Sequence, residues 1–150
     1  MTGNRLLPHH ILESYHVSNV VPMNNGYLRF DSDTKSWCGC ALSAYYLANH
    51  SEYTPEQAFG LTTHYGFDDD TIYAEVIKPW LIKQKQFHPE YLSGFMDGYD
   101  DPKHALLHCT TLGMTFDDRT AHYQNGYYDG SASWDHVSSV MPSVNQASTE

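Results

Sequence analysis

Apolar residues recur at helical spacing along most of the chain, and this pattern predicts a mainly helical protein. Residues 6–16 are expected to hold a short helix that begins after Pro8. A longer helix is expected from Ser36 to about Asn49, capped by Asp33 or by Ser36 itself. Its apolar face would consist of Trp37, Cys40, Ala41, Ala44, Leu47 and Ala48.

The pattern predicts one β-element, a hairpin near the N-terminus. Residues 17–23 and 27–30 are rich in β-branched or aromatic side chains, and they flank the Asn-Asn-Gly sequence at 24–26. An Asn-Gly pair between two such runs is a strong hairpin signal because both residues accept positive φ angles. Pro22 has no N–H to donate, so the first arm is expected at the edge of the sheet.

Capping residues divide the rest of the chain into further helices. The capping box at 54–57 (Thr-Pro-Glu-Gln) opens a helix that is expected to run to about Tyr65. The three aspartates at 68–70 precede the next helix, because carboxylates are favoured at its positive end, and Pro79 is expected to kink or end it. Further helices are expected to begin at His88, at Asp101 and at Asp117 or Asp118, the last of them running to about Met141.

The length of 150 residues fits one globular domain that buries enough surface to need no disulfides. The expected fold class is mainly α (α+β), a compact bundle of about five helices with an N-terminal β-hairpin. Within the single domain 1–150, residues 1–35 would form the hairpin-containing part, residues 36–141 the helical body and residues 142–150 a tail.

Two segments of the helical body repeat each other. Residues 91–98 (Tyr-Leu-Ser-Gly-Phe-Met-Asp-Gly) match residues 123–130 (Tyr-Gln-Asn-Gly-Tyr-Tyr-Asp-Gly) at an offset of 32 residues. Glycines spaced four apart let a second helix backbone approach closely, so the repeat predicts two helices packed on each other. The alternative is a binding face built from Tyr91, Tyr99, Tyr123, Tyr127 and Tyr128.

The charge of the chain is strongly negative, with 18 acidic residues, 8 basic residues and a formal net charge of -10. Such a field repels phosphate and excludes nucleic-acid binding through a basic face. Between Lys35 and Lys78, and again after Arg119, there is no Lys or Arg. An unbalanced acidic surface steers the protein toward basic partners, and the 12 tyrosines offer rigid contact area. The alternative is that the acidity only keeps the protein in solution.

These observations predict a non-enzymatic acidic interaction or inhibitor protein. Its partner would be a basic protein surface, such as that of a nucleic-acid-binding complex, without direct contact to nucleic acid. Small phage inhibitors, including anti-CRISPR proteins and nucleic-acid mimics, resemble it in size and charge. A homo-oligomer packed through the glycine-containing helices is a further possibility. The residues expected at the partner interface are Asp68, Asp69, Asp70, Glu75, Tyr91, Asp97, Tyr99, Tyr123, Tyr127, Tyr128 and Asp129.

A cysteine hydrolase is the alternative function. Cys38 would lie in the first turn of the helix expected from Ser36, where the helix dipole lowers the pKa of a thiol. The segment 36–47 resembles the nucleophile helix of the NlpC/P60 and CHAP cell-wall hydrolases, which use a papain-like arrangement. The resemblance implies Cys38 as nucleophile, with His136, or His108 in second place, as base. The competing interpretation is a buried helix of small residues.

Metals, other cofactors and membranes are not indicated. His104 and His108 lie four residues apart and could share a metal ion with Cys109, Asp100 or Asp101 nearby, but no zinc motif surrounds them. We therefore expect neither a metal nor another cofactor. No signal peptide and no long apolar run is evident, and three cysteines make no disulfide framework, so the expected location is the cytoplasm.

Overall fold

The computed structural model describes residues 5–24, 26–33, 35–50, 52–62, 69–100, 120–141 and 144–145. These residues are mostly helical and include a small sheet. The helices are α1 (Pro8–Ser18), α2 (Ala41–Ala48), α3 (Pro55–Phe59), α4 (Asp69–Ile72), the π-helical turn η1 (Tyr73–Ile77), α5 (Lys78–Lys83), α6 (Pro89–Asp100) and α8 (Ala121–Val140). The strands are β1 (Val21–Asn24), β2 (Leu28–Asp31), β3 (Ser36–Gly39) and β4 (Val144–Asn145).

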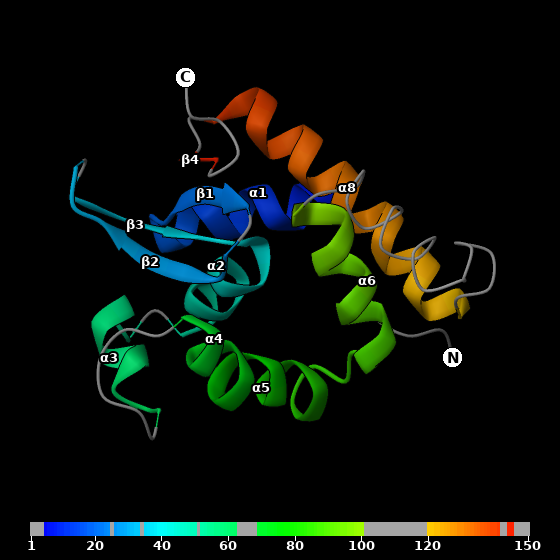
Figure 1. The fold of residues 1–150 in the computed structure, drawn as a ribbon, viewed down its shortest axis with the longest axis horizontal. Coiled ribbons are helices and arrows are strands. Elements are labelled where there is room, and N and C mark those ends of the chain that lie inside the picture. Colours follow the sequence, from blue (N-terminus) through cyan, green and yellow to red (C-terminus); the bar gives the residue numbers. More distant parts are fainter. Residues whose placement is uncertain are drawn as a thin grey trace.

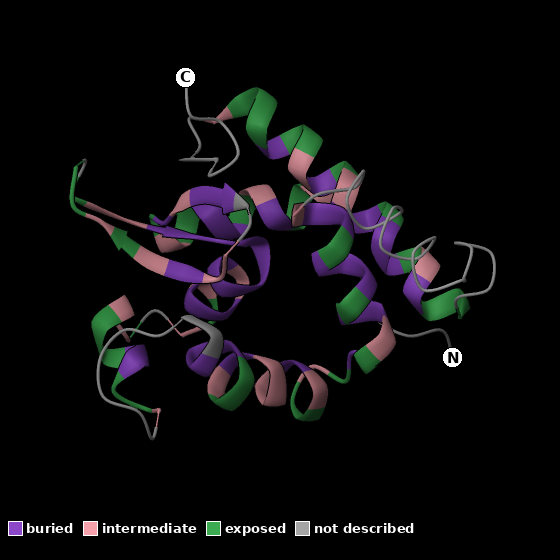
Figure 2. Ribbon diagram, in the orientation of Figure 1, coloured by how far each residue is buried: buried purple, intermediate pink, exposed green. Residues whose placement is uncertain are grey.

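In Figure 1 the sheet lies at the upper left, and most of the helices lie to its right and below it. Helices α6 and α8 run side by side, and α1 contacts both α8 and the central helix α2. Segments α4, η1 and α5 follow one another along the edge that is lowest in Figure 1. Figure 2 shows that the buried residues gather where α1, α2, α6 and α8 face one another.

The prediction of a hairpin around residues 24–26 is wrong, because strands β1 and β2 are not neighbours in the sheet. The strand order is β2-β3-β1-β4, so β1 is an inner strand and not the edge strand that Pro22 predicted. Strand β3 lies between β1 and β2, antiparallel to β2 with Phe30 opposite Trp37, and parallel to β1 with Val21 opposite Cys38. The hairpin is therefore β2–β3, and Lys35 adopts a positive φ of 56° just before β3. Local turn chemistry at 24–26 was outweighed by pairing with a strand farther along the chain.

The helix expected from Ser36 begins only at Ala41, because residues 36–39 form strand β3 instead. All four residues pair with β2, and Cys38 and Gly39 also pair with β1; this pairing overrides a pattern that also fits a helix. Cys40 is the N-cap residue of α2. The helix is buried over most of its circumference, with Ala41, Leu42, Ser43, Ala44, Tyr46 and Leu47 inside.

The predicted capping box at the start of α3 is confirmed. The Thr54 side chain accepts from the Gln57 backbone N–H at 3.2 Å, and Gln57 Oε1 accepts from the Thr54 N–H at 2.8 Å. The helix ends at Phe59, earlier than the pattern suggested. The last long helix begins after Thr120, which caps it by accepting from the Tyr123 N–H, rather than at an aspartate. The helix expected at Asp101 and most of the tail lie outside the described residues.

Pro79 neither ends the helical run nor breaks it sharply. The backbone widens into the π-helical turn η1 directly before it and continues as α5, with Pro79 in the first turn. A π turn is one of the ways in which a helix absorbs the missing N–H and the bulk of a proline.

Two tyrosine hydroxyls join three elements in the centre of the molecule. Tyr15 of α1 donates to the Gly39 carbonyl of β3 at 2.7 Å, and its hydroxyl is also hydrogen-bonded to that of Tyr99 in α6. Both rings are completely buried, and this burial raises the pKa of each phenol well above its usual value. The core is therefore held by specific polar contacts as well as by apolar packing.

Candidate functional site

The glycines of the repeat form the contact between α6 and α8, as the first interpretation predicted. A Cβ added at Gly94 would lie 2.0 Å from the Tyr123 carbonyl oxygen, and one at Gly126 would lie 2.1 Å from that of Tyr91. Gly98 and Gly130 make the same reciprocal approach one turn later. The contacts advance in the same direction along both helices, so α6 and α8 run parallel. Because each contact has a reciprocal counterpart, a local pseudo-twofold axis relates the two helices.

The tyrosines expected on a binding face mostly lie inside this helix pair. Those that are buried are Tyr91, Tyr99, Tyr123 and Tyr127. Their rings fill the space on either side of the glycine contact, so they have little surface to offer a partner. Tyr128, which points outward from α8, is the exposed member of the expected set.

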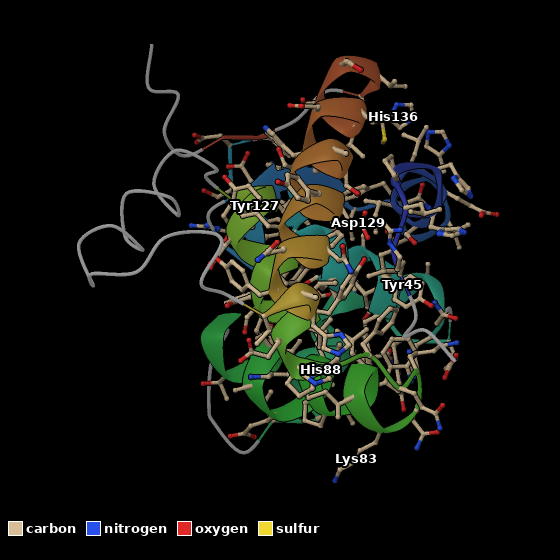
Figure 3. All side chains as sticks on the ribbon, turned by 90° about the vertical axis from the view of Figure 1, so that its right-hand side faces the viewer. Tyr45, Lys83, His88, Tyr127, Asp129 and His136 are labelled. Atoms are coloured by element: carbon tan, nitrogen blue, oxygen red, sulfur yellow. The ribbon has the colours of Figure 1, made fainter. Side chains whose placement is uncertain are left out.

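Two aspartates of the repeat make reciprocal hydrogen bonds across the pair. Tyr91 donates to Asp129 Oδ2 at 2.6 Å, and Tyr123, its counterpart, donates to Asp97 Oδ2 at 2.5 Å. Asp129 is buried, whereas Asp97 is exposed. Arg5 binds Asp129 in a bidentate ion pair at 2.7 and 2.9 Å, and this pair raises the pKa of the guanidinium. Figure 3 shows Asp129 on the flank of α8 toward α1 and Tyr127 on the other flank.

The remaining acidic residues of the expected interface are only partly described. Asp68 lies outside the described residues, and the backbone of Asp69 and Asp70 opens α4. Glu75 of η1 is exposed. Among the expected partner-binding residues whose side chains the structure describes, Glu75, Asp97 and Tyr128 lie on the surface.

The two described cysteines are buried thiols. Cys38 lies in strand β3 and is 1% exposed, and burial raises its pKa. Cys40, the cap of α2, is fully buried, and burial raises its pKa to about 12. Both environments oppose formation of the thiolate that a cysteine hydrolase needs. His136 is exposed on helix α8 rather than on a strand (Figure 3), and His108 lies outside the described residues.

The part of the chain that the structure describes holds no group of three His, Cys, Asp or Glu side chains placed to bind a metal. His88 and His122 stack face to face at 3.9 Å, which directs their ring nitrogens along parallel planes rather than toward one point. His104 and His108 lie outside the described residues. No described helix is both long enough and apolar enough to cross a membrane.

An aromatic surface joins the β2–β3 hairpin to α3, and we call it the hairpin–α3 face. Phe30 is 46% exposed and packs edge-on against Trp37 at 5.6 Å, and Trp37 reaches Phe59 of α3 at 5.7 Å. Leu61, directly after α3, is 49% exposed. The exposed carboxylates on these elements are Asp33, Glu52 and Glu56. Sequence reasoning missed this face because it assigned residues 36–39 to a helix.

A cleft of about 520 Å³ opens between α1, the end of α2 and the connection from α5 to α6. Arg5, His10 and Glu13 line it on one side, and Tyr45 and Lys85 on the other. No signal in the sequence brings these residues together, because they come from three separate elements.

Comparison with protein-family models, with curated proteins and with solved structures found no match to this chain. The function is therefore argued from the geometry and charge of the chain itself.

Proposed function

We propose that this protein is a non-enzymatic interaction or inhibitor protein that binds a basic protein surface through the hairpin–α3 face. The observation that supports it is an exposed aromatic side chain, Phe30, on an end strand of the sheet, among exposed carboxylates. Residues 36–77, which hold Glu52 and Glu56, contain no Lys or Arg, although the hairpin itself carries Arg29 and the exposed Lys35.

The two features have separate physical roles in binding. Covering what remains exposed of Phe30 would contribute about 1 kcal/mol, and Trp37 beneath it keeps the ring in one place. The carboxylates of Glu52 and Glu56 would act mainly by steering a basic partner and by rejecting acidic ones. An aromatic anchor with a charged rim is the usual anatomy of a protein interface.

The partner class follows from the charge of the chain. A surface that attracts this protein must be positive, and grooves that bind nucleic acid are the most consistently positive surfaces on proteins. Its size and net charge of -10 are similar to those of phage inhibitors and nucleic-acid mimics. We propose a nucleic-acid-binding protein or complex as the target.

The charge of the face is tested by affinity capture from cell lysate, with mass spectrometry of the retained proteins. Glu52→Gln with Glu56→Gln removes two charges from the face, and Glu13→Gln with Asp135→Asn removes two exposed charges elsewhere. We expect wild type and the second variant to retain the same basic proteins at low salt. The first variant should retain them about tenfold less. Equal losses in both variants, or retention of the same proteins at high salt, would contradict the proposal.

The apolar anchor is tested in the same assay by a matched pair. Phe30→Ser removes the exposed ring of the face, whereas Val140→Ser changes a similarly exposed side chain on α8. Retention of the basic proteins should fall with Phe30→Ser and remain with Val140→Ser. The reverse result would move the interface to α8.

A further inference from the structure

The cleft between α1, α2 and the α5–α6 connection differs in charge from the rest of the chain. Its lining includes two bases, Arg5 and Lys85, and one acid, Glu13. Asp129, which is not part of the lining, pairs with Arg5, so bases and acids are nearly balanced at the cleft, on a chain that has 18 acidic and 8 basic residues. An anion therefore meets less repulsion at this cleft than over the acidic surface, and the lining offers it a guanidinium and an ammonium group.

Both bases are held in position by their neighbours. Asp129 binds Arg5 through Nε and Nη2, and the Arg5 side chain remains 53% exposed along the cleft. The Lys85 ammonium lies over the rings of Tyr45 and Trp80, at 6.0 and 5.5 Å from their centres. A ligand therefore pays less to order these long side chains than it would on an open surface.

The cleft also offers flat apolar walls and hydrogen-bonding groups. Tyr45 and Phe87, whose rings meet edge to face at 6.3 Å, line one side. His10 accepts from the Leu7 N–H through Nδ1 at 3.2 Å, which assigns the proton of the neutral ring to Nε2. The volume lies within the range that small organic ligands occupy.

We propose that this cleft is a binding site for a small organic anion, a carboxylate that carries a flat apolar ring. Lys85 and Arg5 receive the carboxylate, and Tyr45 and Phe87 contact the ring. The site shares none of these residues with the hairpin–α3 face, so its test is independent of the proposed function.

The test uses the full-length, isotope-labelled protein and two probes of the same shape, 1-naphthoate and its uncharged amide, 1-naphthamide. Binding is followed through the backbone amide signals in nuclear magnetic resonance spectra. We expect saturable changes for naphthoate at residues 45–49 and 85–87. Because one charge-assisted contact is lost, we expect about tenfold weaker binding for the amide.

Lys85→Gln tests the charge inside the cleft, and Lys83→Gln is its matched control. Lys83 is exposed at the end of α5 and points away from the body of the protein (Figure 3). Lys85→Gln should weaken naphthoate binding about tenfold and leave the affinity for the amide unchanged, whereas Lys83→Gln should change neither. Equal affinity of wild type for both probes, changes spread over the surface without saturation, or equal effects of the two substitutions would overturn the proposal. The comparison of the probes on wild type decides this even if a variant folds poorly.

Discussion

Asp97 and Asp129 occupy the same position in the two copies of the repeat, yet they contribute differently to the fold. Asp97 is exposed, so water can replace the hydrogen bond from Tyr123. Asp129 is buried and depends on Arg5 and Tyr91 for its hydrogen bonds. Equal positions in a repeat therefore do not imply equal energies, because the burial of the carboxylate determines what a lost donor costs.

This difference predicts unequal effects of two chemically identical substitutions. Tyr91→Phe removes a donor to buried Asp129 and the acceptor of the Leu6 N–H, which Tyr91 holds at 2.8 Å. It should lower the free energy of unfolding by about 2 kcal/mol. Tyr123→Phe should lower it by about 0.5–1 kcal/mol. Urea denaturation of both variants measures the difference, and equal losses would show that the burial of Asp129 is unimportant.

At the scale of elements, the parallel pair of α6 and α8 depends on having no side chain at four positions. At each of Gly94, Gly98, Gly126 and Gly130, an added Cβ would meet a backbone carbonyl oxygen at 2.0–2.1 Å. No rotamer change relieves a contact between a Cβ and backbone, so the helices would have to separate.

Gly94→Ala and Gly126→Ala should each lower the free energy of unfolding by about 2 kcal/mol or more. In an exposed helix the same change would raise stability by about 1 kcal/mol, so the sign alone is informative. Asn125→Ala, at an exposed position next to Gly126, is the control and should leave stability within about 0.5 kcal/mol. Thermal or urea unfolding measures all three, and a stabilising effect at either glycine would contradict the packing.

Capping residues and prolines correctly predicted where several helices begin. The capping box of α3, the helix after Pro8 and the helix at His88 form where the chain predicts them. Strand β3 was missed because the alternation of Trp37 and Cys38 is too short to separate a strand from a helix turn. Its pairing partners lie elsewhere in the chain, so only the assembled sheet distinguishes the two.

For the molecule as a whole, the core buries several groups that would be charged in alkali. Burial raises the pKa of Cys40 from 9.0 to about 12, and it also raises the pKa values of Tyr15, Tyr73, Tyr91 and Tyr99 above their usual range. Each of these groups keeps its proton more tightly in the folded state than in the unfolded state. Linkage then makes the stability of the fold depend on pH on the alkaline side.

The direction of this dependence follows from the raised values. The stabilisation is complete below pH 9.0, the ordinary pKa of the thiol, and is lost as the pH rises toward about 12. Urea denaturation at neutral pH and within that interval should show a steady fall in the free energy of unfolding. The tyrosinate absorbance of the buried rings Tyr15, Tyr73, Tyr91 and Tyr99 should rise together with unfolding rather than before it. Ionisation of most tyrosines in the still-folded protein would contradict the described burial.

For the candidate binding surfaces, as for the fold, some features could be predicted from the sequence and others could not. The charge of the chain and the basic-residue gap at 36–77 are properties of the sequence, so the proposal of a positive partner needs no coordinates. Of the tyrosines expected to bind that partner, Tyr128 is exposed and the other four are buried, because aromatic rings serve a core as well as an interface. Phe30 and the cleft beside Tyr45 became visible only with the fold.

By itself the sequence determined the helical character of the chain, the capping box of α3, the negative net charge and the helix pair of the repeat. The helices and their caps depend on neighbours within a few residues, the net charge depends on composition, and the helix pair depends on two segments with the same sequence pattern. The tertiary structure alone decided the order of the strands, the burial of both described cysteines and the convergence of Arg5 and Lys85 on one cleft. Those outcomes depend on which distant segments exclude water from one another, and no local pattern records that choice.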